Sequence, residues 1–296
     1  MARSFTLLDG GMGKLLLARG APFRQPEWSA LALMEGPEHV VAAHADFVDA
    51  GADVIITNNY AVVPYHLGDE RFDAQVEELV DLSGRLARQA AERADHRVLV
   101  AGSIPPLFGS YEPDEFDPDR APAMLSRITA ALAPHVDVFL TETQSLLAEA
   151  RESARAAAPH GKPLWLGMTL ADTLVDGEAQ LRSGESIEDT AALVLEVEAG
   201  ALLFNCSQPE VMEAAVVAAR AALPDAIEVG AYANAFESET DDEYAANGTI
   251  LGHRSDLDRG GYTAFVERWL DAGADIVGGC CGIMPEHIAE IDALRR

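Results

Sequence analysis

The stretch Phe47-Val48-Asp49-Ala50-Gly51-Ala52-Asp53-Val54-Ile55 recurs near the other end of the chain as Trp269-Leu270-Asp271-Ala272-Gly273-Ala274-Asp275-Ile276-Val277. Each copy reads as a helix end, a glycine in a left-handed C-cap, and the start of a β-strand. A shorter version is Ala199-Gly200-Ala201-Leu202-Leu203. The recurrence predicts that one helix-to-strand corner is used repeatedly along the chain.

Apolar runs of strand length extend this pattern over the whole sequence. The runs are continuous rather than alternating, which is typical of parallel strands buried on both faces. Eight such units predict the α/β class and a single (β/α)8 TIM barrel domain covering residues 1–296. Two Rossmann-like halves are disfavoured, because no Gly-x-Gly-x-x-Gly fingerprint follows a strand. We expect strands at 7–11, 53–59, 98–103, 136–143, 164–169, 201–206, 227–234 and 275–281.

Helical periodicity fills the intervals between these runs, and several helices begin with Ser or Pro. Long connections follow the third strand (104–120) and the seventh strand (235–259). Both lie after strand C-termini, where long loops of a barrel usually form lids or substrate walls. We expect helices at 37–50, 72–94, 145–158, 186–199, 209–223, 261–272 and 285–294.

The composition excludes several classes of function. With 49 acidic and 21 basic residues, the 296-residue chain has a formal net charge of −28. Nucleic acids and anionic membrane surfaces would repel such a chain, so neither is expected as a partner. No apolar run reaches the roughly 18 residues of a membrane span, and we see no secretory signal. The thiols are therefore expected to stay reduced, which predicts a cytoplasmic protein.

All three cysteines, Cys206, Cys280 and Cys281, lie at the C-terminal tips of the sixth and eighth predicted strands. Three thiolates gathered at strand ends can make an open Zn²⁺ site with one position left for substrate. The flanking glycines, Gly278, Gly279 and Gly282, would let two successive side chains face one ion. The alternative is that the cysteines are small buried apolar residues.

Other polar residues at strand ends resemble a clamp for an amino acid. Asp9 and Glu142 could each take an α-ammonium group, and the backbone N–H groups of Gly10, Gly11 and Met12 a carboxylate. The alternatives are a turn or cap role for Asp9 and a salt bridge for Glu142. Asn205 and Asn234 also end strands, where contact with a ligand and bonding to the backbone are equally expected.

Three aromatic residues, Phe108, Tyr111 and Tyr232, are expected on or beside the same face of the barrel. An aromatic ring can hold a sulfonium or quaternary ammonium group by cation–π attraction. Plain packing of a loop on the rim is the alternative for each of them. The histidines form no ligand cluster, so we expect none of them to bind metal.

Four motifs together resemble those of the homocysteine S-methyltransferase family. They are Asp9-Gly10-Gly11-Met12-Gly13, Thr141-Glu142-Thr143, Asn205-Cys206 and Gly278-Gly279-Cys280-Cys281-Gly282. The resemblance runs in order over essentially the whole chain. It implies a zinc-bound homocysteine thiolate that attacks a methyl donor, so that no catalytic residue is needed beyond the metal-activated thiol. It also implies that the three cysteines bind zinc, that Asp9 and Glu142 hold the homocysteine amino group, and that the Gly10-Gly11 backbone holds its carboxylate.

The methyl donor is the open part of this interpretation. Cobalamin-dependent methionine synthase is similar in this barrel but adds folate and cobalamin domains, which we do not expect here. A sulfonium donor, S-methylmethionine or S-adenosylmethionine, is favoured over glycine betaine because the C-terminal extension of the betaine enzymes has no counterpart here. Another acceptor, such as selenocysteine, is a second possibility. A non-catalytic zinc- or thiol-binding barrel is a third, but it would not need Asp9 and Glu142.

Overall fold

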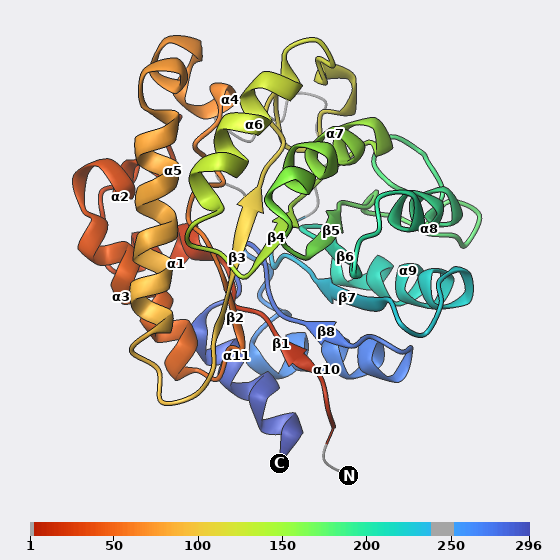
Figure 1. Ribbon diagram of the computed structural model, residues 1–296. Helices are drawn as coiled ribbons and strands as arrows, with labels where there is room; N and C mark the ends of the chain where they lie inside the picture. Colours follow the sequence, from red (N-terminus) through yellow and green to blue (C-terminus); the bar gives the residue numbers. More distant parts are fainter. Residues whose placement is uncertain (1–2, 238–251) are drawn as a thin grey trace.

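Eight parallel strands form the centre of the molecule in the computed structural model, which describes residues 3–237 and 252–296 (Figure 1). The strand order is β1-β8-β7-β6-β5-β4-β3-β2, and a bridge between Leu8 and Val54 joins the two edges. The predicted (β/α)8 barrel is therefore confirmed. The strands are β1 (Thr6–Leu7), β2 (Val54–Ile56), β3 (Leu99–Ile104), β4 (Val138–Thr141), β5 (Leu164–Met168), β6 (Ala201–Asn205), β7 (Glu228–Tyr232) and β8 (Ile276–Val277).

All seven predicted helices are present in the ring around the barrel, with ends that differ by a few residues. Four further helices were not predicted: α1, α2 and α4, which are short, and α6, whose buried Leu125, Ile128 and Leu132 have helical spacing. The helices are α1 (Met12–Ala18), α2 (Ala30–Glu35), α3 (Pro37–Asp49), α4 (Pro64–Leu67), α5 (Asp69–Ala91), α6 (Ala121–Leu132), α7 (Leu147–Ala157), α8 (Ile187–Glu196), α9 (Pro209–Ala222), α10 (Arg259–Asp271) and α11 (Pro285–Asp292).

The repeated corner forms as predicted in two of its three copies. Gly51 and Gly273 follow α3 and α10 with φ of 103° and 104°, a region that suits glycine. The next residue in each copy donates its N–H to a carbonyl five residues back, as in a Schellman cap. The prediction was wrong for the third copy, where the residue with left-handed φ is Glu198 (φ 55°). Gly200 lies two positions later and corresponds to Asp53 of the first copy.

Strand residues pack alternately into two apolar layers. One layer fills the inside of the barrel and includes Leu8, Val54, Leu203 and Ile276. The other lies between the sheet and the surrounding helices, which explains why the strands read as continuous apolar runs. Trp165, on β5, is buried in the inner layer.

Within the described residues, no helix combines the length and apolar character that crossing a membrane requires. The long connection after the third strand is present, and it contains one 3₁₀ turn, Pro113–Glu115. Most of the predicted long connection at 235–259 lies outside the described residues.

Candidate metal centre

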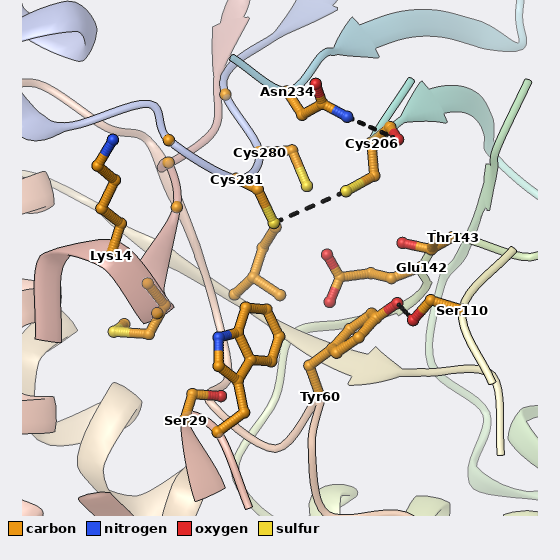
Figure 2. A pocket seen from close by; sticks show the side chains of 18 of the residues that line it. Lys14, Ser29, Tyr60, Ser110, Glu142, Thr143, Cys206, Asn234, Cys280 and Cys281 are labelled. Atoms are coloured by element: carbon orange, nitrogen blue, oxygen red, sulfur yellow. Dashed lines mark hydrogen bonds between the residues drawn. The ribbon is translucent and has the colours of Figure 1, made fainter. Parts of the chain in front are cut away.

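The three cysteines meet at the C-terminal end of the barrel. Their sulfur atoms all lie within 4.8 Å of one another, and Cys206 Sγ is 3.8 Å from Cys281 Sγ (Figure 2). Tetrahedral coordination with metal–sulfur bonds of about 2.3 Å places two ligand sulfurs about 3.8 Å apart. The spacing therefore fits three ligands of one metal ion, with a fourth position left open.

A tight turn lets Cys280 and Cys281 point to the same place. The N–H of Ile283 donates to the carbonyl oxygen of Cys280 at 3.1 Å, and Gly282 has φ of 85°. A four-residue turn with positive φ at its third position favours glycine there. In a regular strand the two side chains would point to opposite faces of the sheet.

Cys206 reaches the cluster through an unusual backbone conformation. Its φ is 55°, a left-handed value that is uncommon for residues other than glycine. Asn234 Nδ2 donates to the Cys206 carbonyl oxygen at 3.0 Å, and the Cys206 N–H donates to Tyr232 O at 3.2 Å. The neighbouring strand end thus fixes the strained residue, as is common at functional sites.

Tyr111, from the long connection after β3, contacts the same sulfur. Its hydroxyl donates to Cys206 Sγ at 3.0 Å. Hydrogen bonds from the side chains of Cys280 and Cys281, and then from Tyr111, hold the pKa of Cys206 well below its ordinary value. The Arg182 guanidinium lies 4.1 Å from the centre of the Tyr111 ring and pairs with Asp172. The segment after β5 therefore supports the tyrosine from outside.

The cysteines line a cavity of about 300 Å³ that also contains two buried carboxylates, Asp9 and Glu142. Asp9 Oδ2 accepts from the Ile56 N–H at 2.9 Å, whereas Oδ1 has no partner among the described residues. Glu142 accepts a bond from the Ser103 hydroxyl. Burial raises the pKa of Asp9 well above its ordinary value and that of Glu142 to about 7. Both groups gain a favourable partner if a cation enters the cavity.

Gly10 and Gly11 lie against the cysteine turn. A Cβ atom on Gly11 would come within 2.7 Å of the Cys280 carbonyl oxygen, so a side chain does not fit there. The Gly11 N–H donates to the Ile283 carbonyl oxygen at 2.7 Å. The expectation that this amide holds a carboxylate is therefore corrected. Of the three amides considered, those of Gly10 and Met12 have no such bond within the described part of the chain.

The structure brings most of the predicted site residues together, but two lie outside the cavity. Asn205 is buried beneath it, where its side chain accepts from the Thr143 N–H and donates to Thr143 Oγ1, both at 2.9 Å. It fixes the end of β4 rather than facing the cavity. Phe108 packs edge-on against Phe116 and beneath Arg120.

Tyr111, Tyr232 and Asn234 do line the cavity. The Tyr232 side chain is buried among the residues that fill the barrel, and its hydroxyl has no partner within the described residues. Asn234 has both side-chain atoms bonded to backbone, since its Oδ1 accepts from the Phe236 N–H at 3.1 Å.

Four aromatic residues of the cavity wall were missed from the sequence: Phe23, Trp28, Tyr60 and Phe236. Trp28 lies between α1 and α2, stacks on His66 at 5.9 Å and meets the Tyr60 ring edge-on at 6.0 Å. The Tyr60 hydroxyl is 2.7 Å from Ser110 Oγ (Figure 2). Tyr60 directly follows Asn58-Asn59 at the tip of the second strand, so the rule used for the other rim residues would have found it. Trp28 has no such signal.

One further missed residue of the cavity is charged. Lys14, on α1, lines the cavity beside Phe236 and Leu17. It was missed because it follows the Asp9–Gly13 motif within a helix that the sequence did not predict.

The comparisons with known proteins agree with this geometry. Residues 6–294 match the family model described as homocysteine S-methyltransferase. The homocysteine S-methyltransferase of Escherichia coli strain K12 is 30% identical over 97% of this chain and 94% of its own length. The selenocysteine methyltransferase of Astragalus bisulcatus is 25% identical over 96% of this chain and 90% of its own.

A solved structure shows the same architecture. The metallated form of the homocysteine methyltransferase MmuM from Escherichia coli is 27% identical and superposes with a TM-score of 0.79. The match covers 98% of this chain and 96% of that one.

Proposed function

The chain belongs to the homocysteine S-methyltransferase family, and we propose that it transfers a methyl group from an onium donor to the sulfur of L-homocysteine at a zinc ion. Zinc is the metal proposed because three clustered thiolates favour zinc over oxygen-preferring cations. When bound, zinc lowers the pKa of a coordinated thiol, so that the sulfur is a thiolate near neutral pH. Chemistry that depends on reduced thiols also suits the cytoplasm.

The observation that carries the acceptor proposal is Asp9 Oδ1, which has no partner among the described residues and lies in the cavity lined by the three thiols. A buried carboxylate oxygen without a partner is costly, and an ammonium group would satisfy it. Glu142 is a further acceptor in the same cavity, as is the Tyr232 hydroxyl, which has no partner in the described part of the chain. Homocysteine joins a thiol and an ammonium group by a short flexible chain, so one molecule suits both parts of the site.

The aromatic wall supports an onium donor. Trp28, Tyr60 and Tyr111 line the cavity that contains the cysteines, and their rings can hold a cation. In the transfer, the homocysteine sulfur forms a bond to the methyl carbon while the bond to the donor heteroatom breaks. The donor leaves as a neutral molecule and no proton has to be added. A sulfonium is favoured over betaine because a neutral thioether is a better leaving group than a tertiary amine.

Selenocysteine is a second candidate acceptor, because a relative with that printed activity matches over nearly the whole chain. Its selenol would occupy the same place as the homocysteine thiol. The two acceptors differ by one methylene group as well as in the reacting atom. Such a difference in a pocket is worth only about 1–3 kcal/mol. The acceptors are therefore to be compared by kcat/KM.

A panel of donors with reduced, zinc-loaded enzyme tests the proposal. Homocysteine would be combined in turn with S-methylmethionine, S-adenosylmethionine, glycine betaine and methyl-tetrahydrofolate, and methionine would be quantified. We expect turnover with a sulfonium and none with the folate, whose leaving nitrogen requires protonation. Methionine formed from the folate alone, with no reaction of any onium compound, would overturn it.

A further inference from the structure

Lys14 lines a cavity that, within the described residues, also contains two buried carboxylates, Asp9 and Glu142, and the three cysteine thiols. Lys14 and Lys162 are the two lysines of the sequence. Lys162 Nζ donates to the Val136 carbonyl oxygen at 2.7 Å. Lys14 instead lines the cavity, half-buried, with Nζ 5.9 Å from the centre of the Phe236 ring. Within residues 3–237 and 252–296 it forms no ion pair, and burial lowers its pKa.

Lys14 lies away from Glu142, one of the two buried carboxylates of the cavity. In Figure 2, Lys14 and Glu142 are on opposite sides of Cys281. Leu17, one turn further along α1, also lines the cavity and is 50% exposed, which places this end of the helix at the cavity mouth. Glu142, in contrast, is buried at the inner end beside the cysteines.

This separation decides which substrate can reach Lys14. The ammonium and carboxylate groups of an α-amino acid share one carbon atom, so they cannot lie on opposite sides of the metal ligands. A homocysteine held through its ammonium group at Glu142 therefore has its carboxylate on the Glu142 side. An anion at Lys14 has to come from the second substrate.

We propose that Lys14 binds the carboxylate of the methyl donor at the mouth of the cavity. The inference rests on the proposed methyl transfer and narrows the donor to onium compounds that carry a carboxylate, such as an amino-acid sulfonium or a betaine. The donor cation would face the aromatic wall while its carboxylate lies outward, against the lysine. A half-buried ammonium group that forms no ion pair within the described residues gains most from such an anion, because part of its hydration is already lost.

The kinetic test uses two donors that differ only in the carboxylate. These are S-methylmethionine and its decarboxylated counterpart, (3-aminopropyl)dimethylsulfonium. In zinc-loaded Lys14→Met, the KM for S-methylmethionine should rise about ten- to a hundredfold, with kcat, the homocysteine KM and the KM for the decarboxylated donor little changed. Lys14→Arg should restore most of the loss. An equal rise for both donors, or a rise in the homocysteine KM instead, would overturn the proposal.

A binding measurement separates this proposal from the proposed function. With ¹³C,¹⁵N-labelled lysine, the chain gives two side-chain signals, and Lys162→Arg assigns them. In the zinc-loaded protein, the Lys14 signal should shift on titration with S-methylmethionine or glycine betaine, but not with the decarboxylated sulfonium. Absence of turnover with every onium donor would refute the proposed function. A Lys14 chemical shift that does not change while calorimetry detects donor binding would refute the lysine site.

Discussion

The hydroxyl of Tyr262 donates a hydrogen bond to the carbonyl oxygen of Gly278, 2.8 Å away and two residues before Cys280. The same hydroxyl lies 3.1 Å from the Ala233 carbonyl oxygen, so it connects the ends of β7 and β8 beneath the cysteines. Tyr262 itself is fully buried and touches no sulfur within hydrogen-bonding distance in the described structure. It therefore holds in place the backbone from which two of the three thiols project.

Tyr262→Phe should weaken metal binding without removing a ligand. The substitution leaves the Gly278 carbonyl oxygen buried with one bond fewer, and loss of an outer hydrogen bond at a metal site typically costs about ten- to a hundredfold in affinity. Competition with a chromogenic chelator measures the change. Metal retention equal to wild type would show that the cysteine turn holds its shape unaided.

The cysteine cluster itself is tested by metal content. Purified, reduced protein should contain about one zinc per chain. Cys206→Ala, Cys280→Ala and Cys281→Ala should each lose most of the metal and nearly all methionine formation, because two thiolates hold zinc poorly. Emission spectrometry gives the stoichiometry, and Phe108→Leu, outside the cavity, is the control. Full occupancy in all three cysteine variants would exclude the proposed ligand set.

Glu142→Gln should weaken homocysteine binding in a way that depends on pH. The pKa of Glu142, raised by burial to about 7, means that the carboxylate is charged above that pH and neutral, like glutamine, below it. At pH 8.5 the variant should bind homocysteine about ten- to a hundredfold more weakly than wild type. At pH 6 the two affinities should converge.

Titration calorimetry of the zinc-loaded proteins at several pH values measures these affinities. The comparison between variant and wild type cancels the proton released by the homocysteine thiol itself, which both proteins share. A ratio of affinities that does not change with pH would argue against an ammonium group at Glu142.

Tyr60 offers a cleaner test of the donor site than Tyr111, which also contacts Cys206. Tyr60→Leu removes the ring and should raise the donor KM about three- to thirtyfold, the range of a cation–π contact. Tyr60→Phe keeps the ring and loses the hydroxyl with its bonds to Ser110 and Thr143, so its donor KM should stay near that of wild type. Steady-state kinetics at saturating homocysteine distinguish them. Equal effects of both substitutions would mean that the hydroxyl, not the ring, matters.

Glu149, at the start of α7, should make stability depend on pH. Burial raises its pKa to about 8, although Glu149 Oε2 accepts from the Ser145 N–H at 3.1 Å. Between its unfolded pKa of about 4.3 and pH 8, the folded state binds more protons, so unfolding becomes easier as pH rises. Glu149→Gln keeps an acceptor oxygen and should remove this part of the pH dependence. At pH 8 it should be more stable than wild type by roughly 2–4 kcal/mol.

Denaturant unfolding at pH 5, 6.5 and 8 measures this effect. Because Glu142 also has a raised pKa, Glu142→Gln serves as the comparison. Parallel pH profiles for Glu149→Gln and wild type would contradict the expectation.

The fold was predictable because strands that are buried on both faces have continuous apolar sequences. The apolar runs gave the number and order of the strands, but strand ends were overestimated. At the eighth strand, for example, Gly279 and Cys280 donate their N–H groups to Asp9 O and Ala233 O after the regular ladder has ended. Apolar character continues there because the loop is buried, so composition alone does not mark where pairing stops.

The candidate site was partly predictable for a similar reason. Residues at the C-terminal ends of strands, such as Asp9, Glu142 and the cysteines, lie at one end of the barrel regardless of the conformation of the loops. Trp28 and Lys14 come from the connection between β1 and α3, where the short helices α1 and α2 were not predicted and the path of the chain depends on tertiary packing. Asn205 followed the strand-tip rule but bonds to Thr143 instead, because its side chain meets the neighbouring strand end.

The cysteine turn packs directly on the loop that follows the first strand, as the contact between Gly11 and Cys280 records. Two of the three sulfurs thus depend on the pairing of β8 with β1, the last strand with the first. A growing chain has Asp9 and Cys206 long before it has the other two thiols. A metal ion held by all three cysteines would therefore be bound only after the last strand has paired with the first.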